Sequence, residues 1–168
     1  TWDDCEEAIG FTLYNPLETL DWLSKTGYFG MESVDSHAPT AHVQVTANTA
    51  QTADRKPGEV SAIAGYKDDD VRITLAATVS SSTESFTTGS VYTGYATYEQ
   101  NTVTTGSGTT VLIVTVNGTN NIGYYDGDYF DSTAYWVKDH VFYALRVFGN
   151  ETDRAEIQAT LDKLLAEI

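Results

Sequence analysis

Several residue types that would mark a class of function are scarce in this chain. It has a single cysteine, Cys5, so no disulfide can form within it. Only nine lysines and arginines oppose 24 aspartates and glutamates, which gives a formal net charge of −15. Such a surface repels phosphate groups, so we expect neither nucleic acid nor an anionic membrane surface as a partner.

Long apolar runs are also lacking. No run approaches the roughly 20 residues that cross a bilayer as a helix, so we expect no direct membrane insertion of this domain. Because the chain does not begin with methionine, we expect either that a signal or anchor segment has been removed or that the sequence starts within a longer chain. Abundant Thr, Ser, Tyr, Asn and Gly with little Lys indicate an extracytoplasmic protein, secreted or held at the cell surface. The acidity favours solubility, a cationic partner or a salt-rich habitat.

The second half of the chain has the clearest structural pattern. The 168 residues fit one domain, 1–168. Residues 71–79 alternate apolar and polar side chains, which predicts a half-buried strand. Residues 109–117 carry apolar side chains on both faces, at 111–114 and 116, which predicts a central strand. A hairpin is predicted from 133–137 and 141–148 around a turn at 138–140. The final segment, 152–167, has apolar side chains at helical spacing.

Those elements predict the fold class. We expect an α+β domain with an antiparallel β-sheet, a C-terminal helix packed on one face and short N-terminal helices. In this arrangement strands 71–79 and 109–117 are neighbours, and the helix covers them with Ile157, Leu161 and Leu164.

The N-terminal segment predicts two helices. Residues 2–9 form the first, which Gly10 ends, and a short strand is expected at 11–14. Asn15 is a good N-cap and Pro16 suits the first position of a helix, so a second helix is predicted over 16–25. Between them and the hairpin, we predict strands at 41–47, 59–67 and 91–98 and a loop at 80–90.

Two groups of residues raise the question of a metal. Closely spaced Asp126, Asp128 and Asp131 are a weak calcium candidate, because the terminal bidentate glutamate of a full calcium loop is missing. Three histidines, His37, His42 and His140, have no further zinc ligands close in sequence, so we interpret them as surface residues. We therefore expect no metal and no cofactor.

Catalytic motifs are equally scarce. The Cys5 thiol lies among Asp3, Asp4, Glu6 and Glu7, whose charges raise a thiol pKa and so favour an unreactive thiol. The serines of 80–85 lack the glycine-flanked elbow of a serine hydrolase. We therefore expect no catalytic residue and no enzymatic activity.

Aromatic residues suggest a binding surface instead. They concentrate in the second half of the chain, and strands rich in them can line a pocket for a sugar, a lipid or a peptide. The candidate ligand-binding residues are Tyr92, Tyr95, Tyr124 and Trp136. The alternative is that tyrosine is simply a good strand residue with a polar tip.

The two ends of the chain carry a resemblance. Residues 6–16 (EEAIGFTLYNP) and 135–145 (YWVKDHVFYAL), followed by the helix at 152–167, resemble a family of unknown function. That family is found in bacterial lipoproteins and membrane-tethered anti-sigma-factor-like proteins. The close of the chain is also similar to the Mog1/PsbP-like fold, where a final hairpin precedes a helix on an antiparallel sheet. The resemblance implies an extracytoplasmic, non-enzymatic domain.

Three hypotheses of function follow. The first is a non-catalytic extracytoplasmic domain that binds or senses another protein or a small ligand. The second is a carrier of a small apolar or sugar ligand in an aromatic-lined pocket. The third is a hydrolase whose site is assembled from residues distant in sequence, where a histidine would meet a carboxylate and a nucleophile.

Overall fold

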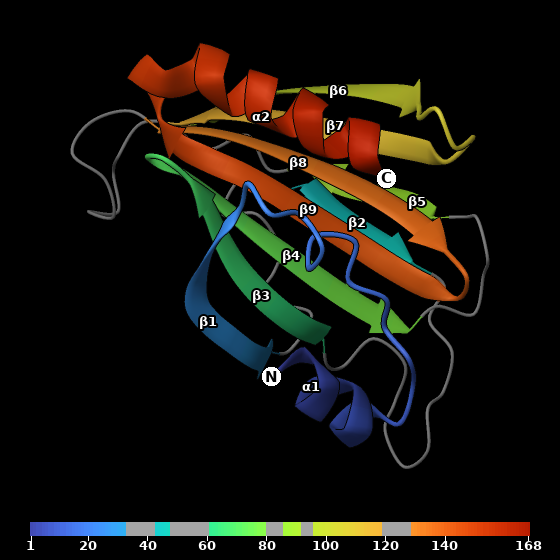
Figure 1. The fold of residues 1–168 in the computed structure, drawn as a ribbon. Coiled ribbons are helices and arrows are strands. Elements are labelled where there is room, and N and C mark those ends of the chain that lie inside the picture. The colour runs from blue at the N-terminus through green and yellow to red at the C-terminus, as the bar shows by residue number, and fades with distance from the viewer. Residues whose placement is uncertain (33–42, 48–60, 80–85, 92–95, 119–128) are drawn as a thin grey trace.

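The computed structural model describes residues 1–32, 43–47, 61–79, 86–91, 96–118 and 129–168. The helices are α1 (Trp2–Ile9), η2 (Glu151–Asp153, a 3₁₀ turn) and α2 (Arg154–Glu167). The strands are β1 (Ser24–Glu32), β2 (Val43–Ala47), β3 (Ser61–Asp68), β4 (Val71–Val79), β5 (Phe86–Val91), β6 (Ala96–Thr104), β7 (Thr110–Gly118), β8 (Tyr129–Lys138) and β9 (Val141–Asn150). Figure 1 shows these elements along the chain.

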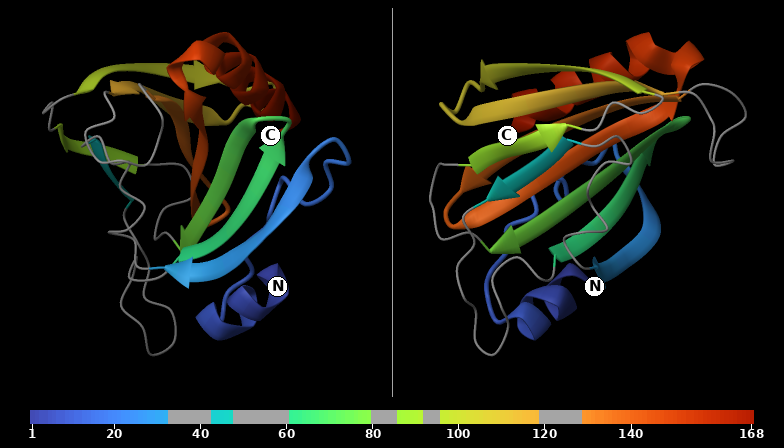
Figure 2. Two further views of the ribbon diagram at one scale, coloured as in Figure 1. Left: turned by 90° about the vertical axis from the view of Figure 1, so that its left-hand side faces the viewer. Right: turned by 180° about the vertical axis from the view of Figure 1, so that it is seen from behind.

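Seven of the strands form one antiparallel sheet, in the order β1-β3-β4-β9-β8-β7-β6. The two remaining strands, β2 and β5, pair with each other as a small second sheet. Figure 2 shows α2 on one side of the large sheet and the β2–β5 pair on the other. The coarse prediction of a mostly antiparallel α+β domain, with helices at both ends of the chain, is therefore confirmed.

Strand β8 is buried along almost its whole length, because both sides of the sheet are covered at its centre. One side of β8 and β9 carries Trp136 and Tyr143, whose rings stack at 4.8 Å between centroids. Their cluster also includes the buried residues of α2, among them Ile157 and Leu164, both 0% exposed. Helix α2 makes its contacts to the sheet with β9, β8 and β4.

The predicted strand 71–79 is confirmed at those bounds, and the predicted strand 109–117 is β7. The two are not neighbours, because β9 and β8 lie between them in the sheet. The prediction of β7 as a central strand is also wrong, because it lies next to the edge strand β6. The hairpin at 133–148 is confirmed and is longer at both ends than predicted. Its turn is tight: Asp139 and His140 have φ values of 50° and 64°, in the left-handed region.

The first predicted helix is confirmed. Thr1 and Asp4 form a reciprocal capping box at its N-terminus, and Gly10 ends it at φ 74°. The predicted strand at 11–14 is wrong, because this segment pairs with no strand in the described part of the chain. It runs beside α1 as an extended segment instead.

The predicted helix at 16–25 is also wrong. The Asn15 side chain accepts a hydrogen bond from the Leu17 amide at 3.0 Å, as a cap would, but the following bonds join residues three apart. These successive turns bury Leu17 and Leu23, at 1% and 9% exposure, and the chain enters β1 at residue 24. Tertiary burial and pairing with β3 therefore override a good local cap.

The predicted division of the central region is partly wrong. The strands expected at 41–47 and 59–67 correspond to β2 and β3. The loop expected at 80–90 contains most of β5, and the strand expected at 91–98 is divided between the end of β5 and the start of β6. Serine and threonine are common in loops, but threonine is also a good strand residue. Composition alone therefore did not locate the start of β5.

Candidate functional site

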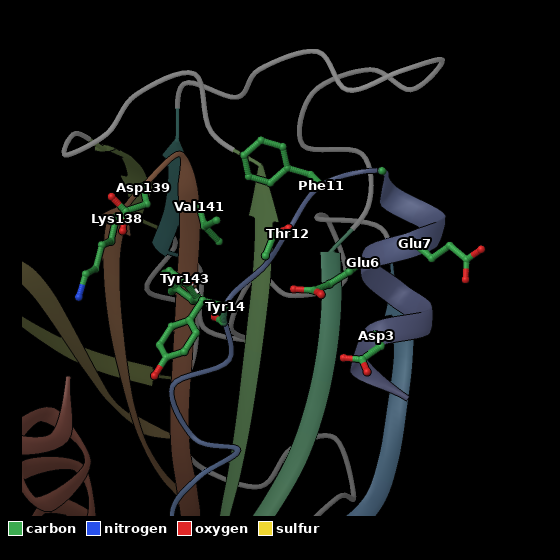
Figure 3. Close-up of a pocket in the computed structure, with 11 residues that line it drawn as sticks. Asp3, Glu6, Glu7, Phe11, Thr12, Tyr14, Lys138, Asp139, Val141 and Tyr143 are labelled. Atoms are coloured by element: carbon green, nitrogen blue, oxygen red, sulfur yellow. Dashed lines mark hydrogen bonds between the residues drawn. The ribbon is translucent and has the colours of Figure 1, made fainter.

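A pocket of about 820 Å³ lies between α1 and the β8–β9 turn. Its lining comes from three places that are far apart in sequence: α1, the extended segment after it, and the start of β9 with the turn before it. The lining residues are Asp3, Glu6, Glu7, Gly10, Phe11, Thr12, Tyr14, Lys138, Asp139, Val141 and Tyr143. Figure 3 shows these residues around the pocket.

Side chains of α1 hold the backbone of the extended segment in place. The Glu6 carboxylate accepts a hydrogen bond from the Leu13 amide at 2.6 Å, and the indole N–H of Trp2 donates to the Leu13 carbonyl. Leu13 itself is fully buried. Because both backbone groups of Leu13 are bound, the neighbouring residues on either side are fixed relative to α1.

The other side of the segment is bound to the sheet. The Tyr143 hydroxyl on β9 donates to the carbonyl of Tyr14 at 2.7 Å. Burial raises the pKa of Tyr143, and the Asp139 carboxylate raises it further, so this hydroxyl keeps its proton and remains a donor. Tyr14 is thus positioned by its backbone and not by its ring.

The Tyr14 ring is exposed. Its side chain is 62% exposed, and no other large apolar side chain in the described part of the chain is exposed to that degree. It lies at the rim of the pocket, on the side nearer to β9 (Figure 3). An exposed aromatic ring on a rigid backbone, at the edge of a pocket, is a common feature of binding sites.

Carboxylates outnumber basic groups around this pocket. Four lining residues carry a carboxylate, namely Asp3, Glu6, Glu7 and Asp139, and one lining residue, Lys138, is a cation. Figure 3 shows Asp3 and Glu6 extending from α1 toward the extended segment, whereas Glu7 lies on the far side of the helix. The pocket therefore combines negative charge with aromatic and apolar surface from Phe11, Tyr14 and Val141.

A second polar group lies on the sheet side that faces away from α2. Asp131 on β8 is 1% exposed, pairs with Arg146 on β9, and accepts a hydrogen bond from the Thr133 hydroxyl at 3.0 Å. The ring of Tyr135, on the same side of β8, stacks on Phe142. The Tyr135 hydroxyl is buried and makes no hydrogen bond of normal geometry. Burial raises its pKa most, the Asp131 charge raises it further, and the neighbouring Thr133 hydroxyl and Arg146 lower it.

The predicted site residues fall mostly outside the described part of the chain. This applies to Tyr92, Tyr95 and Tyr124, and to Asp126 and Asp128 of the calcium candidate. Trp136 is 1% exposed and packs in the core behind Tyr143, so it does not itself line the pocket. Asp131 is engaged by Arg146 and Thr133. Within the described ranges, no three His, Cys, Asp or Glu side chains are grouped to hold a metal ion.

Of the catalytic candidates, the described part of the chain contains only His140 and Cys5. His37 and His42 lie outside the described residues, and His140 is exposed in the β8–β9 turn. Cys5 is buried, and burial raises the pKa of its thiol, with a smaller contribution from Asp4. A thiol with a raised pKa is a poor nucleophile at neutral pH.

Sequence reasoning missed Tyr14, Phe11 and Asp139. The expectation of a short strand at 11–14 gave no sign that the Tyr14 ring is exposed to solvent. The signal was present in Tyr14-Asn15-Pro16, because a residue pair before proline is extended and commonly starts a turn at the surface.

Comparison with known proteins adds no family to this geometry. The chain matches no protein-family model, no curated protein and no solved structure. Among the described residues no helix is long and apolar enough to span a membrane.

Proposed function

We propose that this chain is a non-catalytic binding domain that acts outside the cytoplasm, secreted or tethered to the cell surface. Its α+β framework has a closed side, where α2 packs on the sheet, and its ligand docks in the pocket between α1 and the β8–β9 turn. The observation that carries the proposal is Tyr14, a 62% exposed ring at the rim of that pocket on a backbone bound from both sides.

The lining favours a ligand that carries a positive group beside an apolar part. The lining carboxylates attract an ammonium or guanidinium group. The ring faces of Tyr14 and Phe11 add cation–π attraction, which is worth about 0.5–1 kcal/mol at an exposed site. The net charge of −15 attracts cations to the whole domain and so raises the association rate. A cationic peptide or small amine fits this description.

A carrier of a sugar is the second candidate. Sugars stack their apolar face on an exposed tyrosine and donate hydroxyl hydrogen bonds to carboxylates, and the pocket offers both. This candidate uses Tyr14 in place of the tyrosines predicted from sequence. It differs from the first in its independence of salt, because a neutral ligand gains nothing from the net charge.

Thermal shift measurements separate the two candidates. A bound ligand raises the melting temperature by mass action, so the purified chain is heated with agmatine, lysine amide, spermidine, or short arginine peptides, and separately with a panel of monosaccharides and disaccharides. We expect the cationic probes to raise the melting temperature at low salt and less at high salt. Stabilisation by sugars alone would favour the second candidate.

Matched variants locate the effect. Tyr14→Ala removes the exposed ring, and we expect it to abolish the shift given by the cationic probes while leaving the unliganded melting temperature nearly unchanged. Asp3→Asn removes one charge at the pocket, and Glu156→Gln, which removes one from an exposed carboxylate on α2, is its control. Equal shifts in the wild type and Tyr14→Ala, or turnover of any ester, peptide or glycoside in a hydrolase panel, would refute the proposal.

A further inference from the structure

The edge strand β6 lacks the features by which proteins usually protect a sheet edge. Exposed edges are normally kept short, bulged, or protected by charged side chains, especially lysine, or by proline, because their unpaired backbone groups can pair with another chain. The single charged residue of β6 is Glu99. β6 has nine residues, pairs with β7 in nine consecutive positions without a register shift, and contains neither lysine nor proline. In the described part of the chain, β7 is the only strand that pairs with β6.

The opposite edge of the sheet differs. β1 also ends the sheet, but its register with β3 shifts between Lys25 and Phe29, and the strand carries charged residues at Lys25 and Glu32. Helix α1 contacts it as well. One edge of the same sheet is thus protected in the usual manner and the other is not.

The β6 edge is also nearly free of charge. From Ser85 to Tyr125 the sequence contains a single charged residue, Glu99, although the chain as a whole has 33 (9 + 24). Strand β7, behind β6, has none. The β6 side chains Glu99, Gln100, Asn101, Thr102 and Thr104 are exposed and extend to both sides of the sheet. Figure 1 shows β6 as the border of the large sheet.

We propose that β6 is a self-association edge, at which a second copy of this chain pairs antiparallel to form one sheet through both molecules. Two copies with a charge of −15 repel each other over most of their surface, so a contact between them is least unfavourable where the charge is lowest. A twofold axis at Asn101 opposes Gln100 to Thr102 and Glu99 to Val103. No like charges then face each other across the pair.

Sedimentation equilibrium over a wide range of protein concentration tests this directly. We expect a monomer–dimer equilibrium that shifts toward the dimer as salt is added, because salt screens the repulsion between the two acidic bodies. A dimer held by ion pairs would weaken instead. A monomer at every concentration and salt level would overturn the proposal. That result is also the one expected if β6 pairs only with a different protein.

A pair of double variants assigns the contact to β6. Gln100→Glu with Thr102→Glu places carboxylates opposite each other across the proposed twofold axis, and we expect the dimer dissociation constant to rise by roughly tenfold or more. Gln158→Glu with Thr152→Glu makes the same exchanges and the same charge change at exposed positions on and before α2. We expect that control to leave the dissociation constant within about twofold of the wild type.

Hydrogen exchange supplies a reading that does not depend on the variants. At high protein concentration the amides of 96–104 should gain protection relative to low concentration, and those of β1 should not. A dimer whose added protection lies elsewhere, or whose affinity is equally reduced by the two double variants, would contradict the assignment to β6.

Discussion

Two tyrosines with the same burial should respond oppositely to loss of their hydroxyl group. Tyr135 and Tyr143 are each 3% exposed, and each ring stacks on an aromatic neighbour. The Tyr143 hydroxyl donates to the Tyr14 carbonyl. The Tyr135 hydroxyl makes no hydrogen bond of normal geometry, although the Thr133 hydroxyl, which donates to Asp131, lies close enough to lower its pKa. Replacement by phenylalanine keeps the ring in both cases and removes only the hydroxyl.

The magnitudes follow from the cost of burying an unpaired polar group. A buried hydroxyl without a hydrogen bond costs about 1–3 kcal/mol, so Tyr135→Phe should raise the free energy of unfolding by about 1–2 kcal/mol. In a chain of this length each kcal/mol changes the melting temperature by roughly 2–4 °C, so we expect a rise of roughly 2–8 °C. Tyr143→Phe loses a made hydrogen bond and should destabilise by about 1 kcal/mol.

Urea unfolding followed by circular dichroism measures both variants against the wild type under one condition. Most substitutions destabilise, so a gain in stability from a buried replacement is an unusual result that chance does not readily supply. If Tyr135→Phe destabilised as much as Tyr143→Phe, the Tyr135 hydroxyl would be hydrogen-bonded in solution, and the reasoning would fail.

Three further outcomes are expected. Asp131→Asn removes the buried carboxylate that pairs with Arg146 and should cost about 2–4 kcal/mol in urea unfolding, whereas Glu151→Gln at the more exposed Arg154 pair should cost less than about 1 kcal/mol. Burial raises the pKa of the Tyr143 hydroxyl above the ordinary tyrosine value of about 10. The stability that this protonated hydroxyl contributes is therefore fully present below about pH 10 and is lost as the pH rises through the folded-state pKa. In an alkaline titration, the phenolate absorbance of Tyr143 should appear together with unfolding. Leu164→Ala opens a cavity at a fully buried position of α2 and should cost about 2–5 kcal/mol by the same urea measurement, and a loss below about 1 kcal/mol would show that α2 is not part of the core.

The regular strands could be predicted from sequence because their patterns depend on burial alone. The first half of β4 alternates because one of its sides faces the core, whereas residues 75–79 are buried on both sides. In β7 the apolar residues 111–114 and 116 mark a strand that is mostly buried on both sides. The final helix was visible for the same reason: its apolar residues repeat at helical spacing, and Ile157, Leu161 and Leu164 are all buried.

The segments that form the pocket could not be predicted in that way. Residues 11–14 look like a strand, but their hydrogen bonds go to the side chains of Trp2 and Glu6 and to Tyr143, 129 residues after Tyr14. Asn15 accepts the hydrogen bond from the Leu17 amide that a helix cap would make. The backbone hydrogen bonds after it join residues three apart, so no α-helix follows. Contacts between residues so distant in sequence leave no periodic signal, so the position of Tyr14 required the structure.

The proposed ligand site is the pocket between α1 and the β8–β9 turn. Amide chemical shifts, recorded while small cationic and sugar fragments are titrated into the ¹⁵N-labelled chain, show where those fragments bind. We predict that shift changes concentrate in residues 3–14 and 138–143, and that they vanish in Tyr14→Ala. Changes that concentrate on the opposite face of the sheet, around Asp131 and Tyr135, or an absence of changes with every fragment, would contradict it.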